Sequence, residues 1–235
     1  MAWKIPKIWE GGTAWIIGCG TSLLFEFGIP FGLARKVING ELPLSEYSPY
    51  LAPIHDKHVI GVNHAFLIGN WIDVFYFSDK EMYTQSDMDT RIAEFEGLRI
   101  TNNPDMGNDR EFLESADIKY VRRSTKKAWG LSPEKDAVCF NANSGMSAID
   151  LAYHFGAKRI ILLGMDMTCT ELGSHIHSMG TKLSKGQDPT KSFQRHMRSA
   201  WDIYKDAQEK EIEILNASAV SKIPYFPKVK AKDYF

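Results

Sequence analysis

Short apolar runs rich in β-branched residues alternate along the chain with segments of helical spacing. The runs occupy residues 13–17, 57–63, 71–77, 98–101, 118–121, 160–163 and 213–216. Each has the length of a strand, and several are uninterrupted by polar residues, as expected of strands covered on both faces. The alternation of strands and helices predicts a doubly wound α/β fold with a mostly parallel sheet.

The segment 143–166 has the clearest pattern. Four apolar residues recur at helical spacing and predict one apolar helix face: Ala148, Leu151, Ala152 and Phe155. Ser144 is a suitable N-cap, and Gly156 is a natural stop. The apolar run 160–163 then predicts a central strand, which ends in Gly-x-Asp at Asp166.

Other helices are expected over 31–39 and 81–96. A long amphipathic helix is indicated by a third set of apolar residues: Phe193, Met197, Ala200, Trp201, Tyr204 and Ala207. The 235 residues suit one domain, residues 1–235. Prolines divide the connection 41–56, which could be a flap, and 170–191 is polar enough to be a lid.

Composition excludes some classes and leaves others open. The formal net charge of −1 gives no overall electrostatic reason to bind nucleic acid or an anionic membrane. Three cysteines without Cys-x-x-Cys spacing, and no apolar run of membrane-spanning length, favour a cytoplasmic protein. The aromatic segments 1–12 and 223–229 could pack on the domain or on a second copy in a homo-oligomer.

The most basic patch consists of Arg122, Arg123, Lys126 and Lys127. It could meet an acidic substrate or a nucleic-acid backbone. A solvated face is the more common outcome for so short a run.

Small and polar residues follow several predicted strands, and carboxyl ends of parallel strands share one edge of a sheet. They form the candidate nucleotide- and phosphate-binding set: Gly18, Gly20, Thr21, Ser22, Asn63, Asp79, Asn143, Ser144, Gly145 and Asp166. Glycines allow close backbone approach, and free amides and hydroxyls donate to anionic oxygens. Leu23 stands where the dinucleotide fingerprint has its third glycine, so a tight turn is an equal alternative. Asn63 and Asp79 could also be helix caps.

His175 and His177 lie in a polar loop just past the predicted central strand. A histidine can serve as a base or an acid near neutral pH. Metal binding would need a third ligand that the sequence does not indicate, so no metal ligands are assigned. The alternatives are surface histidines or a helix cap.

Six motifs in order resemble a group of often phage-encoded proteins. They are Gly-x-Gly-x-Ser-Leu at 18–23, Val-Ile-Gly-Val-Asn at 59–63, Trp-Ile-Asp-Val-x-Tyr-Phe-Ser-Asp at 71–79, the Asn-Ser-Gly to Gly-Met-Asp unit at 143–166, His-x-His at 175–177 and Asn-Ala-Ser at 216–218. The group is similar to two others: the bacterial sialyltransferases of glycosyltransferase family 42 and the archaeal-type 6-hydroxymethyl-dihydropterin diphosphokinases.

The first resemblance implies a modified Rossmann-like domain that binds a CMP-activated sugar under a small lid. It implies nucleotide contacts from the loop after the first strand (Gly20, Thr21 and Ser22), from Asn63, and from the turn at Ser144 and Gly145. It also implies a catalytic histidine, matched by His175 or His177, that deprotonates an acceptor hydroxyl. Cys19 departs from the asparagine that sialyltransferases usually carry there.

Three hypotheses follow. The first is a nucleotide-sugar-dependent glycosyltransferase without a fixed cofactor, whose donor carries CMP or another nucleotide and whose acceptor is a glycan or a modified nucleic acid. The second is a diphosphotransferase acting on a pterin-like or nucleoside substrate, in which Asp166 or Asp79 would hold Mg²⁺. The third is a nucleotide-binding module without catalytic activity.

Overall fold

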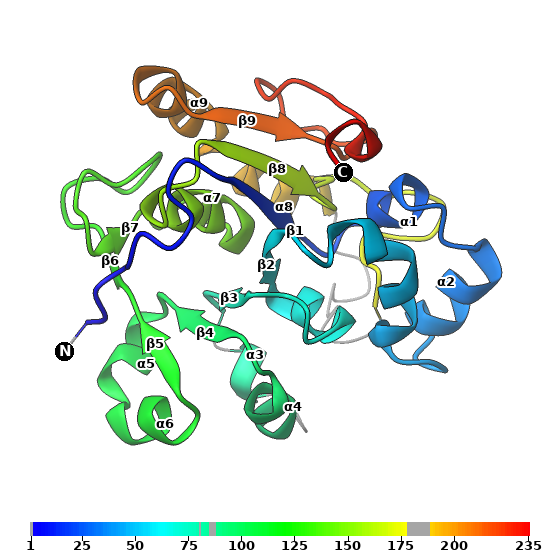
Figure 1. Cartoon of the computed structure of the whole chain (residues 1–235), viewed down its shortest axis with the longest axis horizontal. Helices are drawn as coiled ribbons and strands as arrows, with labels where there is room; N and C mark the ends of the chain where they lie inside the picture. The colour runs from blue at the N-terminus through cyan, green and yellow to red at the C-terminus, as the bar shows by residue number, and fades with distance from the viewer. Residues whose placement is uncertain (1, 80, 85–87, 178–188) are drawn as a thin grey trace.

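The structure is a computed structural model that describes residues 2–79, 81–84, 88–177 and 189–235. In this part of the chain seven strands form a parallel sheet in the order β5-β4-β3-β2-β1-β8-β9 (Figure 1). Their bounds are β1 Thr13–Ile17, β2 His58–Val62, β3 Val74–Phe77, β4 Leu98–Thr101, β5 Ile118–Tyr120, β8 Arg159–Leu163 and β9 Glu213–Asn216. The predicted doubly wound α/β fold is confirmed.

The strand order reverses direction beside β1. From β1 the chain adds β2 to β5 on one side, and it then returns to place β8 and β9 on the other side. In open parallel sheets, ligands bind outside the carboxyl ends of the strands at such a switch point. The topology therefore points to the loops after β1 and β8.

Two hydrophobic clusters cover the two faces of the sheet. Trp15 and Ile17 belong to one cluster, whereas Ala14 and Ile16 belong to the other, because successive side chains of a strand point to opposite faces. The first face is covered by α1 (Ser22–Glu26), α2 (Phe31–Ile38), η1 (Leu44–Ile54), η2 (Asn63–Ile68) and α4 (Met88–Glu94). The second is covered mainly by α7 (Ser144–His154) and α9 (Ala200–Glu209).

The described chain also has helices outside these two sets. They are α3 (Glu81–Thr84), which shares the predicted segment 81–96 with α4, then α5 (Pro104–Asn108), α6 (Arg110–Ser115), α8 (Pro189–His196) and η3 (Ala231–Tyr234). The tail packs on its own domain, since Phe226 is buried and Val229 donates its amide to the Asn216 carbonyl. None of the described helices has the length and apolar character needed to cross a bilayer.

The single long helix predicted around residues 193–207 is wrong. The chain turns at 197–199, between α8 and α9. Ser199 is buried there and donates its hydroxyl to the Asn141 carbonyl at 3.0 Å, while the Ala200 amide donates to the Met197 carbonyl in a tighter turn. Apolar residues keep a helical spacing across residues 197–199, but the tertiary contact of Ser199 breaks the helix there.

The start of α7 also differs from the prediction. Asn143, not Ser144, is the N-cap, and its Oδ1 accepts the Met146 amide at 3.1 Å. The helix has no solvent-facing stripe over its first nine residues, because all of them are buried, including Asp150. The sequence predicted one buried face for this helix, but the structure buries it on all sides over those nine residues.

Between β5 and α7 the chain forms a second small unit. Its strands β6 (Arg122–Arg123) and β7 (Ala137–Val138) pair with each other in parallel, apart from the main sheet. We call residues 124–140 the strap. Figure 1 shows this unit next to α7. Leu131 and Val138 belong to the same hydrophobic cluster as α7, whereas η2 belongs to the cluster on the other face of the sheet.

The structure describes the whole of the predicted flap but only part of the predicted lid. Residues 44–54 form the 3-10 helix η1, whose Leu44, Tyr47, Leu51 and Ile54 are buried in the core. The hydroxyl of Tyr47 donates to the Ile176 carbonyl at 3.1 Å, so η1 holds the loop that carries the two predicted histidines. The flap stays a prediction, and half of the lid, residues 178–188, lies outside the described residues.

Removing the Tyr47 hydroxyl should reveal this anchoring. Tyr47→Phe should lower the free energy of unfolding by about 1–2 kcal/mol, because the buried Ile176 carbonyl loses a donor. Tyr50→Phe is the matched control, since Tyr50 lies on the same helix and is only half-buried. Urea unfolding of both variants measures the difference, and equal stabilities would show that η1 is not anchored here.

Candidate functional site

A cavity of about 840 Å³ opens at the carboxyl edge of the sheet, at the switch point. Most of the residues selected from the sequence line it: Gly18, Gly20, Asn63, Asp79, Asn143, Ser144, Gly145, Asp166, His175 and His177. Thr21 and Ser22 do not, because both are buried beside it. The convergence of strand ends expected for a parallel sheet thus occurs around one space.

The glycine-rich loop after β1 packs tightly against the loop after β8. The amides of Gly18 and Gly20 donate to the carbonyls of Leu163 and Gly164, each at 2.8 Å. A β-carbon on Gly20 would lie 2.6 Å from the Gly164 carbonyl oxygen and equally close to the Asp166 carboxylate. These glycines are therefore required by packing, and two of the loop's amides already have protein acceptors.

Asp166 completes this junction. Its carboxylate accepts the Ser22 amide at 2.8 Å and also a short hydrogen bond from the Ser22 hydroxyl. Burial raises the pKa of Asp166, and the hydrogen bonds from Ser22 oppose that rise. The Thr21 and Thr170 hydroxyls are 2.7 Å apart. Direct contact of Thr21 or Ser22 with a phosphate stays a prediction, because both side chains already bond within the protein.

The amino terminus of α7 presents the open donors of the site. Within the described residues, the amides of Ser144 and Gly145 have no protein acceptor, while the next amide is held by Asn143. The Ser144 hydroxyl donates to Asp79 at 3.4 Å. Free amides and the helix dipole favour an anion at this end of an 11-residue helix.

A strained turn aims this helix end into the cavity. Asn141 and Ala142 both have left-handed backbones, with φ of 52° and 49°. Such conformations cost an alanine free energy, and surrounding contacts must fix them. Here the Asn141 side chain does so, accepting the Gly130 amide at 2.8 Å and donating to the Gly130 carbonyl at 3.0 Å.

Asn63 stands at the carboxyl end of β2 with φ of 52°. Its Oδ1 is buried and has no hydrogen-bond partner among the described residues, although Asn63 lines the cavity. A buried acceptor of this kind is costly unless a ligand or water supplies a donor. Neighbouring Cys19 donates its thiol to the Val62 carbonyl, and burial raises its pKa to about 12, so it remains uncharged.

Four histidines of the described residues line the cavity, and two of them, His64 and His196, were not predicted from the sequence. The rings of His64 and His177 are 4.3 Å apart, and those of His175 and His177 are 5.4 Å apart. His196 lines the same cavity from the end of α8. His64 could have been selected from the sequence, because it directly follows Asn63 at the end of a predicted strand. Nothing in the sequence around His196 indicated that it would line the cavity.

The surroundings of His175 and His196 favour the neutral form of both rings. Burial lowers the pKa of His175, and the charges of His64 and His196 lower it further. Burial and the neighbouring Arg195 lower the pKa of His196. His175 Nδ1 also lies 2.7 Å from the Ser174 hydroxyl, which orients the ring. A neutral, oriented imidazole at pH 7 can accept a proton.

Charged residues make the cavity locally cationic. Arg123, Arg195 and Arg198 line it, against the carboxylates of Asp79 and Asp166. Asp166 is already engaged with Ser22. No group of three His, Cys, Asp or Glu residues in the described ranges is arranged to hold a metal ion. The cavity therefore suits an anionic ligand.

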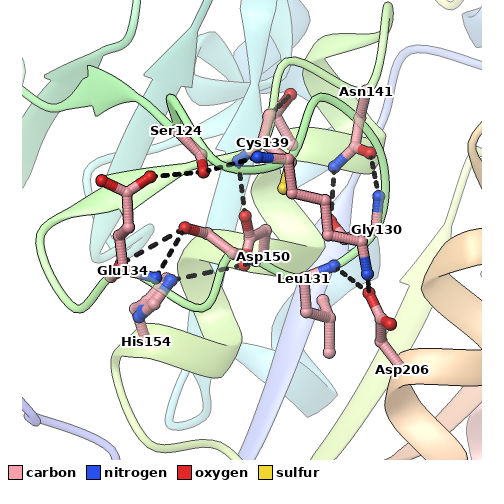
Figure 2. A network of polar contacts seen from close by, with 12 residues as sticks. Ser124, Gly130, Leu131, Glu134, Cys139, Asn141, Asp150, His154 and Asp206 are labelled. Atoms are coloured by element: carbon pink, nitrogen blue, oxygen red, sulfur yellow. Dashed lines mark hydrogen bonds and ion pairs between the residues drawn. The ribbon is translucent and has the colours of Figure 1, made fainter.

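The strap is held on the protein by buried carboxylates, as Figure 2 shows. Asp150 of α7 accepts the amides of Ser132 and Cys139 at 2.9 and 2.6 Å, and its Oδ1 lies 3.4 Å from His154. Asp206 of α9 accepts the Leu131 amide at 2.7 Å. These contacts fix the strap to two helices.

Comparison with known proteins gives a structural likeness only. No family model matches the sequence, and no curated protein matches it either. The sialyltransferase CstII from Campylobacter jejuni in complex with CMP-3FNeuAc superposes with a TM-score of 0.52 and 17% identity, over 93% of this chain and 86% of that one. This chain has the fold of that sialyltransferase.

Two further structures are similar, each over 86% of its own chain. One is CstII from Campylobacter jejuni with cytidine-5'-monophosphate, at a TM-score of 0.48, 12% identity and 98% of this chain. The other is CST-II with a trisaccharide acceptor and CMP, at a TM-score of 0.49, 15% identity and 93% of this chain. The superposition with the CMP-3FNeuAc complex, at a TM-score of 0.52, confirms the Rossmann-like fold that the resemblance to the sialyltransferases implies.

The buried pair behind the strap should give two opposite pH dependences. Burial raises the pKa of Asp150 from 3.8 to about 7, so its stabilisation is full below 3.8 and is lost as the pH rises through 7. Burial lowers the pKa of His154 from 6.5 to about 4, so its stabilisation is full above 6.5 and is lost as the pH falls through 4.

Urea unfolding at several pH values tests these signs. The stability difference between wild type and Asp150→Asn should shrink as the pH rises from 4 to 7. The difference between wild type and His154→Gln should grow over the range 4 to 6.5. Slopes of the same sign for the two variants would contradict this assignment.

Proposed function

We propose that this protein is a nucleotide-sugar-dependent glycosyltransferase, similar to the sialyltransferases, with a CMP-activated or related donor. One observation carries the proposal. The Asn63 oxygen, the open amides of α7 and a cluster of histidines, all from separate segments, face one cationic cavity at the switch point. Transfer from an activated donor to an acceptor hydroxyl needs three things: a contact to the nucleoside, a binding site for the phosphate and a base for the hydroxyl proton.

The donor phosphate is assigned to the amino terminus of α7. The amides of Ser144 and Gly145 donate to it, and the helix dipole adds favourable charge. Asn63 Oδ1 accepts an N–H or O–H from the nucleoside, which removes its desolvation cost. The glycine-rich loop serves mainly as packing under this seat, because Asp166 already accepts the Ser22 amide.

The reaction is a group transfer between two oxygens. A neutral histidine takes the proton of the acceptor hydroxyl as that oxygen forms a bond to the anomeric carbon of the donor sugar. The bond between that carbon and the phosphate oxygen breaks, and the nucleotide leaves with the electron pair. The α7 amides stabilise the charge that develops on the leaving phosphate. Base catalysis of this kind contributes about 100- to 10,000-fold.

Of the two histidines selected from the sequence, His175 is the better placed base. His177 is only 4% exposed and packs against His64, whereas His175 is half-buried and oriented by Ser174. His196 is a further candidate, because it lines the same cavity and burial lowers its pKa.

A ligand screen should support nucleotide binding. We expect CMP, compared with UDP, GDP and ATP, to raise the unfolding temperature without Mg²⁺, by the linkage between binding and stability. Asn63→Ala should weaken CMP binding about tenfold in calorimetry, because a ligand donor loses its acceptor. Asn108→Ala, at an exposed position, is the control. Shifts that need Mg²⁺ would favour the diphosphotransferase instead, and no shift with any nucleotide would favour the non-catalytic module.

Histidine variants separate binding from chemistry. His175→Gln should keep CMP affinity within about twofold and lower kcat by about 100-fold or more, because only proton transfer is lost. His177→Gln and His196→Gln test the other two candidates, and His58→Gln, at the opposite end of β2, is the control. Full turnover by all three cavity variants would exclude His175, His177 and His196 as the base.

A further inference from the structure

The strap presents an aromatic surface to the cavity. Phe140 is 41% exposed, and Trp129 is half-buried. Both line the cavity together with Arg123, whose guanidinium lies 4.4 Å from the centre of the Phe140 ring. Exposed aromatic rings inside a cavity, rather than scattered on the surface, indicate a ligand-binding role.

This surface is built rigidly. The Asn141 amide donates to the Ala128 carbonyl at 3.0 Å, and the Asn141 side chain bonds both backbone groups of Gly130. Trp129 is therefore held between two residues that Asn141 fixes, and Phe140 directly precedes Asn141. Figure 2 shows Asn141 and Gly130 joined in this way. Fully satisfied buried networks of this kind rigidify what they hold.

We propose that Trp129 and Phe140 form a subsite that stacks a sugar ring of the acceptor. The inference rests on the proposed function, since it names the acceptor side of the same cavity. The C–H groups on one face of a pyranose carry partial positive charge and fit the negative face of an aromatic ring. Arg123 covers one face of Phe140 and donates its Nε–H to the Asn102 carbonyl at 3.1 Å, so its position is fixed as well.

The position of the surface favours a sugar over the nucleotide base. The Asn63 oxygen, which suits a nucleoside and has no partner among the described residues, comes from the first residue of η2. η2 packs on one face of the sheet, whereas α7 and the strap pack on the other. With the phosphate at the amino terminus of α7, the nucleoside lies toward η2. The reacting sugar and the acceptor then lie toward the strap.

Saturation-transfer NMR with methyl galactoside, methyl glucoside, methyl N-acetylglucosaminide and lactose tests the subsite, in parallel with CMP calorimetry. Wild type should bind at least one of these sugars, with transfer strongest to one face of the ring. Trp129→Ala and Phe140→Ala should each weaken sugar binding about tenfold and leave CMP affinity unchanged. Trp129→Phe should retain sugar binding, because it keeps a ring.

Trp201→Ala is the matched control, since Trp201 is an exposed tryptophan on α9 outside the cavity. Variants that bind sugar as wild type does would overturn the proposal, as would a wild type that binds no sugar of the panel. Loss of CMP binding with sugar binding intact would show that the rings stack the nucleobase. If the protein binds sugar through Trp129 but binds no nucleotide, the result would support the subsite and contradict the proposed transferase function.

Discussion

The close approach of β1 and β8 at their carboxyl ends determines the rest of the site. A β-carbon on Gly18 would lie 2.6 Å from the Gly164 carbonyl oxygen, so only glycine allows the two loops to meet. That contact brings Asp166 to the Ser22 amide. The loop beyond is tied in turn, because the Ile176 amide donates to the Cys19 carbonyl at 2.8 Å. Packing between two strand ends thus positions the histidine loop.

This packing has a chemical consequence. A loop whose amides donate to the neighbouring strand cannot also form an open anion nest. The free donors for an anion are found instead at α7, whose first amides have no protein acceptor in the described chain. Placing that helix end requires the left-handed pair Asn141 and Ala142, and the contacts of Asn141 with Gly130 offset its cost. The same hydrogen bonds of Asn141 therefore stabilise the strained turn and order the strap.

The sequence predicted the sheet well, because buried parallel strands are short apolar runs that local composition determines. It also predicted that Asn63, Ser144 and Asp166 would meet, since topology alone brings strand ends together. It could not predict the break between α8 and α9, which depends on Ser199 reaching a carbonyl 58 residues away. Nor could it find Trp129, because an aromatic residue in a polar loop has no periodic signal.

The basic patch shows why charge runs are hard to interpret without a fold. Arg122 and Arg123 are adjacent in the sequence, but they lie on a strand and so point to opposite sides. Arg122 pairs with Glu134 of the strap at 2.7 Å, whereas Arg123 stacks on Phe140 in the cavity. Arg122 thus holds the strap by an ion pair, whereas Arg123 contributes to the wall of the cavity. The chain is nearly neutral as a whole, yet three arginines and only two carboxylates line its cavity among the described residues, so charge is distributed unevenly over the molecule.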